Sequence, residues 1–242
     1  MIKLSIVIPC YNEAKNIPLV IEKLNEADTV NFEVILVNNG STDNTMDVLS
    51  NLSCKKKISL KIINIKKNIG YGNGIMSGIR MAEGEIIAWT HSDLQTDPLD
   101  IINAFYTFHE NLINKKSILK GKRKGRNIFD AFFTYCMGLV SSIFMRVKLS
   151  DINAQPKMFH RDFLDKMEEP PLDFSLDLYL LYIAKLNNYS ILEYPVFFNK
   201  RKFGESKGGG TLVGKWKLIK RTWSYIYELK TKLDRKNGNY NS

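Results

Sequence analysis

Four short, β-branched apolar runs in the first 90 residues constrain the fold more than any other feature of this chain. The runs occupy residues 4–8, 33–37, 60–65 and 85–90. They lack a regular apolar–polar alternation, which is typical of strands buried on both faces of a sheet. Helix-like segments separate them at residues 16–27, 42–52 and 71–82, and the first two begin near Pro18 or near Ser and Asp capping residues. This βαβαβαβ order predicts an α/β protein with a doubly wound, mostly parallel sheet.

Polar loops follow each of these runs. In a doubly wound sheet, ligands bind beyond the carboxyl ends of the strands. The four loops read PCYNE (9–13), NNGSTD (38–43), KKNIGYGNG (66–74) and HSDLQTDP (91–98). We therefore expect the loops to meet at one edge of the sheet, and we place the active site there.

The second half of the chain is less regular. Its expected elements are a strand near residues 117–120, a basic loop at 121–126, a helix around 174–186 and a strand at 190–198. Between the loop and the helix lies an apolar segment, 128–147, whose core of 15 residues (131–145) carries no charge. That core is shorter than the roughly 20 residues needed to span a bilayer. We expect a buried or interfacial helix, interrupted at Gly138.

Composition excludes several classes of protein. With 44% hydrophobic and 25% charged residues, the 242-residue chain has the composition of a folded globular protein. The apolar run at the N-terminus is short and broken by Pro9, so it does not resemble a secretion signal, and we expect the chain in the cytoplasm. Cys10, Cys54 and Cys136 have no metal-binding spacing and are odd in number, which argues against a zinc site or a disulfide framework.

Positive charge is concentrated at the C-terminal end. The formal net charge is +10, and residues 199–242 contribute 12 basic and 3 acidic residues, or +9 of it. From Leu212 onward, apolar residues recur at helical spacing with lysines between them. We expect a domain over residues 1–210, followed by a basic amphipathic helix and tail over 211–242. This helix suits the inner face of an anionic membrane or a membrane partner protein. The alternative is a helix packed on the core with a solvated basic face; nucleic acid is not expected.

Five segments, taken in order, resemble family 2 glycosyltransferases with the GT-A fold. Within that family they resemble the polyprenyl-phosphate sugar transferases typified by dolichol-phosphate mannose synthase. The segments are VIPCYNEAKNI (7–17), NNGSTDNT (38–45), NIGYGNGIMSGIRMAEG (68–84), HSDLQTDP (91–98) and FNKRKFGESK (198–207). The resemblance covers about residues 3–207. It implies an inverting transferase that takes a sugar from a nucleotide-sugar donor.

A divalent metal, Mg or Mn, is implied by the fourth segment. A departing nucleotide diphosphate carries charge that a cation held by oxygen ligands neutralises. The family's D-x-D-L-Q loop surrounds this metal, and the aligned residues here are His91, Asp93 and Gln95. His91 replaces a carboxylate with an imidazole, which favours manganese or softer metals over magnesium. The alternative is that His91 is a side chain at the sheet edge that binds no metal.

The resemblance also assigns donor contacts. The matching positions are Pro9, Tyr11, Asn12, Glu13, Asn38, Asn39, Asn68, Gly70, Gln95 and Lys207. Asn38 and Asn39 stand where the family more often has aspartates, and an amide both donates and accepts, so the base preference is open. The same NGST residues can instead form a turn and helix cap. A nicotinamide fingerprint is excluded, because Ile75 stands at the third glycine of G-x-G-x-x-G.

Arg201 and Lys207 are the candidates for binding the diphosphate, since a guanidinium bridges two phosphate oxygens and an ammonium adds a point charge. The glycines that follow, Gly208 to Gly210, are expected to let this segment close over the donor. The alternative is a solvated basic linker. We expect Arg201 to act in catalysis together with Asp93.

Acceptor binding leaves two classes open. The lipid-phosphate transferases use arginines before the interfacial helix, where Arg123 and Arg126 lie, and a D-x-x-S-G segment after it, which Lys157 follows here. Ala154 and Gln155 replace the Ser-Gly of that segment. A polyprenyl phosphate needs no general base, whereas a glycan hydroxyl does, and Asp177 occupies that place, with Asp173 as a second candidate. Both aspartates can also be helix caps, and a non-catalytic nucleotide-sugar-binding protein is a third alternative.

Overall fold

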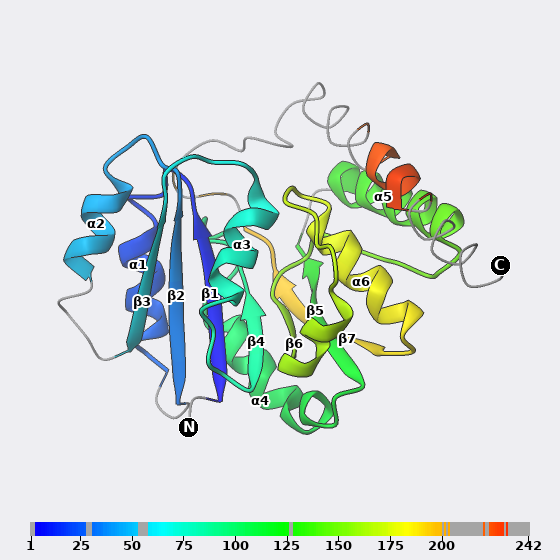
Figure 1. Cartoon of the computed structure of the whole chain (residues 1–242), viewed down its shortest axis with the longest axis horizontal. Coiled ribbons are helices and arrows are strands. Elements are labelled where there is room, and N and C mark those ends of the chain that lie inside the picture. The colour runs from blue at the N-terminus through cyan, green and yellow to red at the C-terminus, as the bar shows by residue number, and fades with distance from the viewer. Residues whose placement is uncertain are drawn as a thin grey trace. The chain divides into compact units, whose positions relative to one another are not determined.

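The structure is a computed structural model that describes residues 3–27, 31–52, 58–125, 128–199, 201, 203, 220, 223–229 and 231 (Figure 1). The chain forms two compact units. The first comprises Met1–Arg126 and Asn153–Gly204, and the second comprises Asn127–Ile152 and Glu205–Ser242. The domain boundary predicted between residues 210 and 211 lies outside the described residues and stays a prediction.

A seven-stranded sheet forms the centre of the first unit, in the order β3-β2-β1-β4-β6-β5-β7. The strands are β1 (Leu4–Cys10), β2 (Phe32–Asn39), β3 (Ser59–Ile65), β4 (Ile86–Trp89), β5 (Ser117–Lys124), β6 (Lys157–His160) and β7 (Ser190–Phe197). β6 runs antiparallel to β4 and β5, and the other neighbouring strands pair in parallel. The predicted α/β fold with a mostly parallel sheet is therefore confirmed.

Helices cover both faces of the sheet. They are α1 (Ile17–Leu24), α2 (Thr45–Leu52), α3 (Tyr71–Ile79), α4 (Asp100–Ile113) and α6 (Leu176–Leu186), and a short 3₁₀ helix, η1, spans Arg161–Lys166. In β1, alternate residues such as Ile6 and Ile8 join a core with α1, α2 and α4, whereas Val7 faces α3. A Cβ added to Gly78 of α3 would lie 2.4 Å from Val7 Cγ1, so this glycine lets the helix approach the sheet closely.

The predicted N-terminal helices and strands match α1–α3 and β1–β4. The helix predicted around 174–186 matches α6, and the strands predicted near 117–120 and at 190–198 match β5 and β7. The expectation that residues 60–65 are buried on both faces is wrong, because β3 lies at the edge of the sheet and most of its residues are partly exposed. α4, β6 and η1 have no counterpart among the elements predicted from the sequence. β6 is only four residues long, KMFH, and its polar ends hide the strand pattern.

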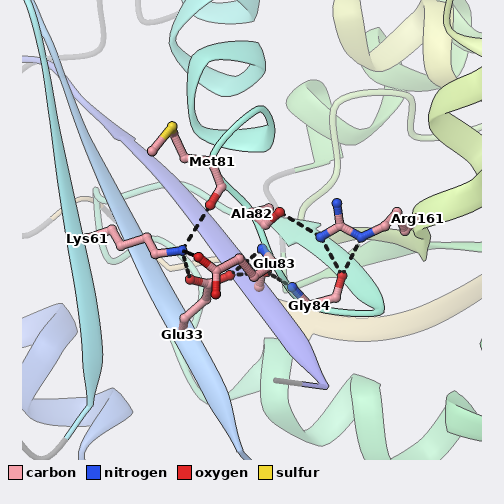
Figure 2. Close-up of polar contacts among 8 residues, drawn as sticks. Glu33, Lys61, Met81, Ala82, Glu83, Gly84 and Arg161 are labelled. Atoms are coloured by element: carbon pink, nitrogen blue, oxygen red, sulfur yellow. Dashed lines mark hydrogen bonds and ion pairs between the residues drawn. The ribbon is translucent and has the colours of Figure 1, made fainter. Parts of the chain in front are cut away.

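At the edge where the strands begin, away from the carboxyl ends, a buried carboxylate ties α3 to the sheet (Figure 2). Glu33 of β2 is fully buried and accepts hydrogen bonds from Ser5 Oγ and from the Glu83 main-chain N–H, both at 2.6 Å. Lys61 Nζ lies 2.8 Å from Glu33 and 2.5 Å from Glu83. Burial raises the pKa of Glu33, but these donors outweigh it and the pKa is lowered overall.

Arg161 completes this arrangement from η1. Its guanidinium donates to the carbonyls of Ala82 and Gly84, at 2.6 Å and 2.8 Å from Nη2 (Figure 2). These carbonyls belong to the segment that connects the end of α3 to β4. The network thereby fixes the C-terminal end of α3, and with it the direction in which the N-terminal end of the helix points.

The second unit contains α5 (Ile128–Met145). The predicted interruption at Gly138 is wrong, since α5 runs through this residue, which packs against the Leu149 carbonyl. Tyr135, Leu139 and Ile143 are 67%, 48% and 64% exposed, and their spacing of four places them on one stripe. Phe144 contacts Trp223 edge to face, with ring centroids 4.5 Å apart.

Of the predicted basic amphipathic C-terminal helix, the structure describes only residues 220, 223–229 and 231, which are helical. The rest of that helix lies outside the described residues and stays a prediction. Among the helices that the structure describes, none combines the length and the apolar character needed to cross a membrane.

Candidate active site

The loops after β1 and β2 are joined by hydrogen bonds at the carboxyl edge of the sheet. Asn12 donates its main-chain N–H to Ser41 Oγ at 3.1 Å, and its side-chain oxygen accepts from the Thr42 N–H at 2.8 Å. The Glu13 N–H donates to Thr45 Oγ1 at 3.0 Å. These bonds hold the predicted donor residues Asn12 and Glu13 against the start of α2.

The loop after β3 lies against the end of β2. Asn39 donates to the Gly70 carbonyl at 2.9 Å, and Gly70 in turn donates its N–H to Asn68 Oδ1 at 3.0 Å. Gly70 has a φ of 140°, and an added Cβ would lie 2.1 Å from the Leu172 carbonyl oxygen. This position therefore requires glycine for both its backbone conformation and the close approach of the 172 segment.

The loop after β4 completes the edge. Ser92 Oγ donates to the Pro9 carbonyl at 3.2 Å, and the Gln95 N–H donates to Asp93 Oδ1 at 3.1 Å. All four loops thus meet at one edge of the sheet, as the sequence predicts. Tyr11, in the first loop, is half-buried.

Arg201 brings two acidic side chains from different loops together. Its Nη2 lies 3.0 Å from Glu13 Oε1 and 3.2 Å from Asp93 Oδ2. The same part of the chain is held to the loop after β4 by Asn199, whose N–H donates to the Gln95 carbonyl at 2.7 Å. Gln95 Nε2 donates to the Asn199 carbonyl at 3.3 Å. Predicted donor, metal and catalytic residues are therefore neighbours.

Burial makes the Glu13 carboxylate harder to ionise. Burial is the largest cause that raises the pKa of Glu13, and Asp93 and Asp43 raise it further. The Asn16 side chain, which donates to Glu13 Oε2 at 2.5 Å, and the Arg201 cation oppose this rise. The site therefore gathers negative charge that Arg201 partly balances.

The two asparagines at the end of β2 differ in their bonding. Asn38 is 4% exposed, donates to Asn64 Oδ1 at 2.9 Å and accepts from the Ser41 N–H at 3.2 Å, so it supports the turn. Asn39 is 3% exposed, and its Oδ1 has no hydrogen-bond partner among the described residues. A buried acceptor without a partner is costly unless a ligand or water supplies a donor. Asn39 is thus the more direct candidate for a donor contact.

A buried polar cluster lies beneath this edge, on the α3 and α6 side. Asp177, in the first turn of α6, accepts from Gln155 Nε2 at 3.0 Å and 3.2 Å and from Trp89 Nε1 at 3.3 Å. Lys157 Nζ lies 3.3 Å from Asp177 Oδ1 and donates to the Ala154 carbonyl at 2.6 Å. Gln155 also donates to the Tyr71 hydroxyl at 3.0 Å.

Two residues with roles predicted from the sequence, Lys157 and Asp177, are buried in this cluster. Lys157, predicted to bind the acceptor, is 0% exposed, and Asp177, predicted as a base for a hydroxyl acceptor, is 2% exposed. The contacts of Trp89 and Tyr71 in this cluster are not predicted from the sequence, where Gln155 appears only as a departure from Ser-Gly. The signal available for Trp89 was its place at the carboxyl end of a predicted strand, and Tyr71 opens a predicted helix within a loop that is predicted to contact the donor.

His91 lies beside the same cluster. Its ring centroid is 5.6 Å from that of Tyr71, and Tyr71 stacks on Phe174 with centroids 5.0 Å apart and planes at 10°. Burial raises the pKa of Tyr71 well above its usual value, and the Asp177 charge raises it further. The Tyr71 hydroxyl therefore stays protonated at neutral pH.

Three nearby residues offer donors to a divalent cation. Asp93 supplies carboxylate oxygens, Gln95 an amide oxygen and His91 an imidazole, a mixed set that suits manganese. The Asp93 carboxylate already attracts the Arg201 cation, so the position fits positive charge. In the described part of the chain, no three His, Cys, Asp or Glu side chains gather closely enough to hold a metal by themselves. A bound cation would therefore need further oxygens, which a donor diphosphate can supply.

The predicted acceptor residues are only partly described. Arg123, near the end of β5, places its guanidinium carbon 5.4 Å from the centre of the Phe198 ring. Phe198 lies three residues before Arg201 in the chain. Arg126 and Lys207 lie outside the described residues, so their predicted contacts to acceptor and donor stay predictions.

Comparison with known proteins assigns the family. Glycosyl transferase family 2 matches residues 5–142, more than half of the chain. The chain belongs to this family. The match spans the first four resembling segments and confirms the family predicted from them.

Curated relatives of this family-2 chain are distant. The dolichol-phosphate mannosyltransferase of Pyrococcus furiosus is 25% identical over 87% of this chain and 60% of its own length. The dodecaprenyl-phosphate galacturonate synthase of Rhizobium johnstonii is 27% identical over 69% of this chain and 50% of its own. An undecaprenyl-phosphate 4-deoxy-4-formamido-L-arabinose transferase of Yersinia enterocolitica is 34% identical over 41% and 31%. The chain thus spans between about a third and three fifths of these relatives.

Solved structures confirm the fold. Glucosyl-3-phosphoglycerate synthase from Mycobacterium tuberculosis, solved with Mn²⁺, UDP and glucosyl-3-phosphoglycerate, aligns with a TM-score of 0.69 at 16% identity. That alignment covers 93% of this chain and 79% of the synthase. A mannosyltransferase from Pyrobaculum calidifontis, solved with GDP-Man and Mn²⁺, gives 0.64 at 17% identity, over 84% and 58%. At these identities the likeness supports the architecture of the family-2 chain and no finer assignment.

Proposed function

We propose that this chain carries the catalytic unit of an inverting glycosyltransferase that moves a sugar from a nucleotide-diphosphate donor to a polyprenyl phosphate. The three curated relatives named above are transferases or synthases of polyprenyl or dolichol phosphates, which supports this acceptor class. The donor class is supported by the solved relatives, whose structures hold UDP or GDP-Man.

The contacts of the Asp177 carboxylate favour one of the two acceptor classes. A hydroxyl acceptor must lose its proton to a base that reaches it. Both Asp177 oxygens instead accept from Gln155, and Lys157 and Trp89 lie against one of them inside the protein. A phosphate acceptor is already an anion and needs no such base. The engagement of Asp177 therefore favours a phosphate acceptor over a glycan hydroxyl.

The residues at the carboxyl edge have separate parts in this proposal. The loops after β1 and β2, with Asn39 as the unsatisfied acceptor, hold the nucleoside. Arg201 binds the diphosphate, because a guanidinium pairs with two phosphate oxygens at once. An acceptor phosphate oxygen attacks the anomeric carbon from the face opposite the diphosphate. The new carbon–oxygen bond forms as the bond to the diphosphate breaks, and the configuration inverts.

Asp93, Gln95 and His91 would hold a divalent cation beside the leaving diphosphate. When bound, such a cation neutralises the charge that develops on the diphosphate. Manganese is favoured over magnesium by the imidazole of His91. The solved relatives that contain Mn²⁺ support the same metal class.

A membrane surface is the proposed location, at the cytoplasmic face. The stripe of Tyr135, Leu139 and Ile143 on α5 supports it, because exposed apolar residues at helical spacing suit the boundary between headgroups and acyl chains. The basic residues of 199–242 add attraction to anionic lipids.

Transfer to a glycan hydroxyl is the second candidate, favoured by Ala154 and Gln155 in place of the Ser-Gly of the lipid-phosphate enzymes. The two are separated by incubating the protein with UDP, GDP and CDP sugars, a short polyprenyl phosphate or a glycan, and Mg²⁺, Mn²⁺ or chelator. Metal-dependent formation of a lipid-linked sugar is expected. Transfer to the glycan alone would refute the phosphate acceptor, and donor binding without transfer to either would indicate a non-catalytic protein.

Asp177→Asn sharpens this test. With a phosphate acceptor, the folded variant keeps its turnover, within about threefold, although the loss of the partner of the buried Lys157 lowers its stability. The pH profile of its kcat keeps its shape, because no proton passes through this carboxylate. Asp165→Asn, at an exposed position of η1, is the matched control for the loss of one carboxylate. Loss of about a hundredfold or more in kcat, with the acidic limb of the profile removed, would instead assign Asp177 as the base.

A further inference from the structure

The Glu13 and Asp93 side chains approach each other across two loops, with the Arg201 guanidinium between them. Arg201 Nη2 contacts both, at 3.0 Å and 3.2 Å. Glu13 and Asp93 are 8% and 9% exposed, so water screens their repulsion poorly. Asp93 is among the groups that raise the pKa of Glu13, and Arg201 is among those that lower it. The pair therefore depends on a positive charge placed between its two carboxylates.

Arg201 provides that charge from a part of the chain distant in sequence. The arginine follows β7, and Asn199 is hydrogen-bonded to Gln95 on both of its main-chain groups. Two of the three proposed metal-binding residues, Asp93 and Gln95, are thus engaged by residues 199 and 201. A cation arriving at Asp93 must compete with the guanidinium for Asp93 Oδ2.

We propose that Arg201 is a tethered counter-cation for the Glu13–Asp93 pair, displaced from Asp93 by a divalent metal and thereby released to bind the donor diphosphate. This inference rests on the proposed function. Glu13 then has a positioning role, because Glu13 Oε1 holds Arg201 near the site after the metal has bound Asp93. The displacement also orders the events, because the guanidinium becomes available to the diphosphate when the metal has replaced it.

Competition between Arg201 and the metal for Asp93 predicts that replacing Arg201 changes the affinities for metal and for donor in opposite directions. Arg201→Met removes the competitor, so Mn²⁺ alone binds about three- to tenfold more tightly, the size expected for the net contribution of one hydrogen bond. The same variant binds a nucleotide-diphosphate sugar with Mn²⁺ at least about tenfold more weakly, because the diphosphate loses its guanidinium. Arg201→Lys keeps the charge without the planar fork, so both shifts become smaller.

The test measures Mn²⁺ binding by the loss of the free-ion electron paramagnetic resonance signal, on the full chain without donor. Arg80→Met is the matched control, because Arg80 is exposed at the C-cap of α3 and its loss also removes one positive charge. Calorimetry then gives the donor affinity in the presence of Mn²⁺. Thermal melts establish that each variant is folded.

Opposite shifts in Arg201→Met, absent from Arg80→Met, are the expected result. Equal Mn²⁺ affinities in the parent protein and Arg201→Met would overturn the inference, as would the absence of Mn²⁺ binding in both. Failure of the proposed function is seen separately, as a parent protein that binds no nucleotide-diphosphate sugar at any metal concentration. A parent that binds and transfers donor while Arg201→Met leaves metal affinity unchanged refutes the counter-cation alone.

Discussion

Lys157 Nζ lies 3.3 Å from Asp177 Oδ1, and the two side chains are 0% and 3% exposed. Removing one member of a buried ion pair leaves an uncompensated charge, which costs about 3–5 kcal/mol. We therefore expect Lys157→Met to lower the free energy of unfolding by about that amount. Lys157→Met combined with Asp177→Asn should recover much of the loss, because the unpaired carboxylate is gone.

Urea denaturation of the two single variants and the double variant measures this coupling as a double-mutant cycle. Lys148→Met serves as the control, since Lys148 is a lysine outside the buried cluster and its loss also removes one charge. Additive effects of the two substitutions would mean that Lys157 and Asp177 do not stabilise each other.

Acid stability should depend on Glu193 of β7. Burial raises its pKa, but Lys122 and Lys120 outweigh that effect and lower it to about 2. Lys120 is 2% exposed and lies 2.9 Å from Glu193 Oε1. A lowered folded-state pKa means that the unfolded chain binds protons first as pH falls. The contribution is therefore complete above the unfolded value of about 4.3 and is lost as pH approaches 2.

Glu193→Gln is expected to flatten the dependence of unfolding free energy on pH between about 4.5 and 2, measured by urea denaturation at several pH values. Glu22→Gln, on the exposed face of α1, controls for the loss of one carboxylate. If the unfolding free energy of Glu193→Gln fell with pH as steeply as that of the parent protein, the ion pairs of Glu193 would not persist in solution.

Local sequence patterns suffice for the parts of the fold that repeat. The runs that form β1–β4 are apolar and β-branched, and the polar loops after them meet because parallel strands end at the same edge. The apolar pattern does not reveal β6, because this strand is only four residues long and has the polar residues Lys157 and His160 at its ends. Helix α4 carries Ile101, Phe105 and Leu112 on its buried side, so a local signal was present there.

The candidate site, like the fold, is predictable from the sequence only in part. The motif matches lie in three separate segments, which contain Glu13, Asp93 and Arg201. The structure places the two carboxylates against the Arg201 guanidinium. No local pattern predicts that Lys157 is buried, because lysine is rarely found inside a protein unless it is paired. Its partner Asp177 lies 20 residues further along the chain. Such a pairing is set by strand order and helix placement, which sequence spacing does not encode.

Gly70 should tolerate alanine far less than Gly125 does. Both have positive φ, 140° and 74°, but an added Cβ at Gly70 would lie 2.1 Å from the Leu172 carbonyl oxygen. At Gly125 the nearest atom among the described residues would be Phe197 Cδ1, at 3.8 Å. Gly125→Ala therefore measures the backbone cost, about 1–2 kcal/mol. Gly70→Ala adds a clash that moves the 68–74 loop, so donor affinity falls as well as stability.

Thermal unfolding and donor calorimetry on the two variants check this expectation. The difference between them combines the carbonyl contact with the backbone conformation of Gly70, φ 140° and ψ 163°, which is essentially restricted to glycine. Equal stability and equal donor affinity in Gly70→Ala and Gly125→Ala would mean that the 172 segment does not pack on the donor loop in solution.

The proposed membrane attachment through α5 gives a prediction independent of catalysis. Ile143 is 64% exposed on the apolar stripe of this helix. Ile143→Glu should lower binding to vesicles containing anionic lipid by about tenfold or more, because an apolar contact is lost and a like charge is added. Asn103→Glu, at an exposed position of α4, adds the same charge away from the stripe and should bind nearly as the parent does. Co-sedimentation with vesicles measures both, and equal losses in the two variants would mean that net charge, not α5, governs attachment.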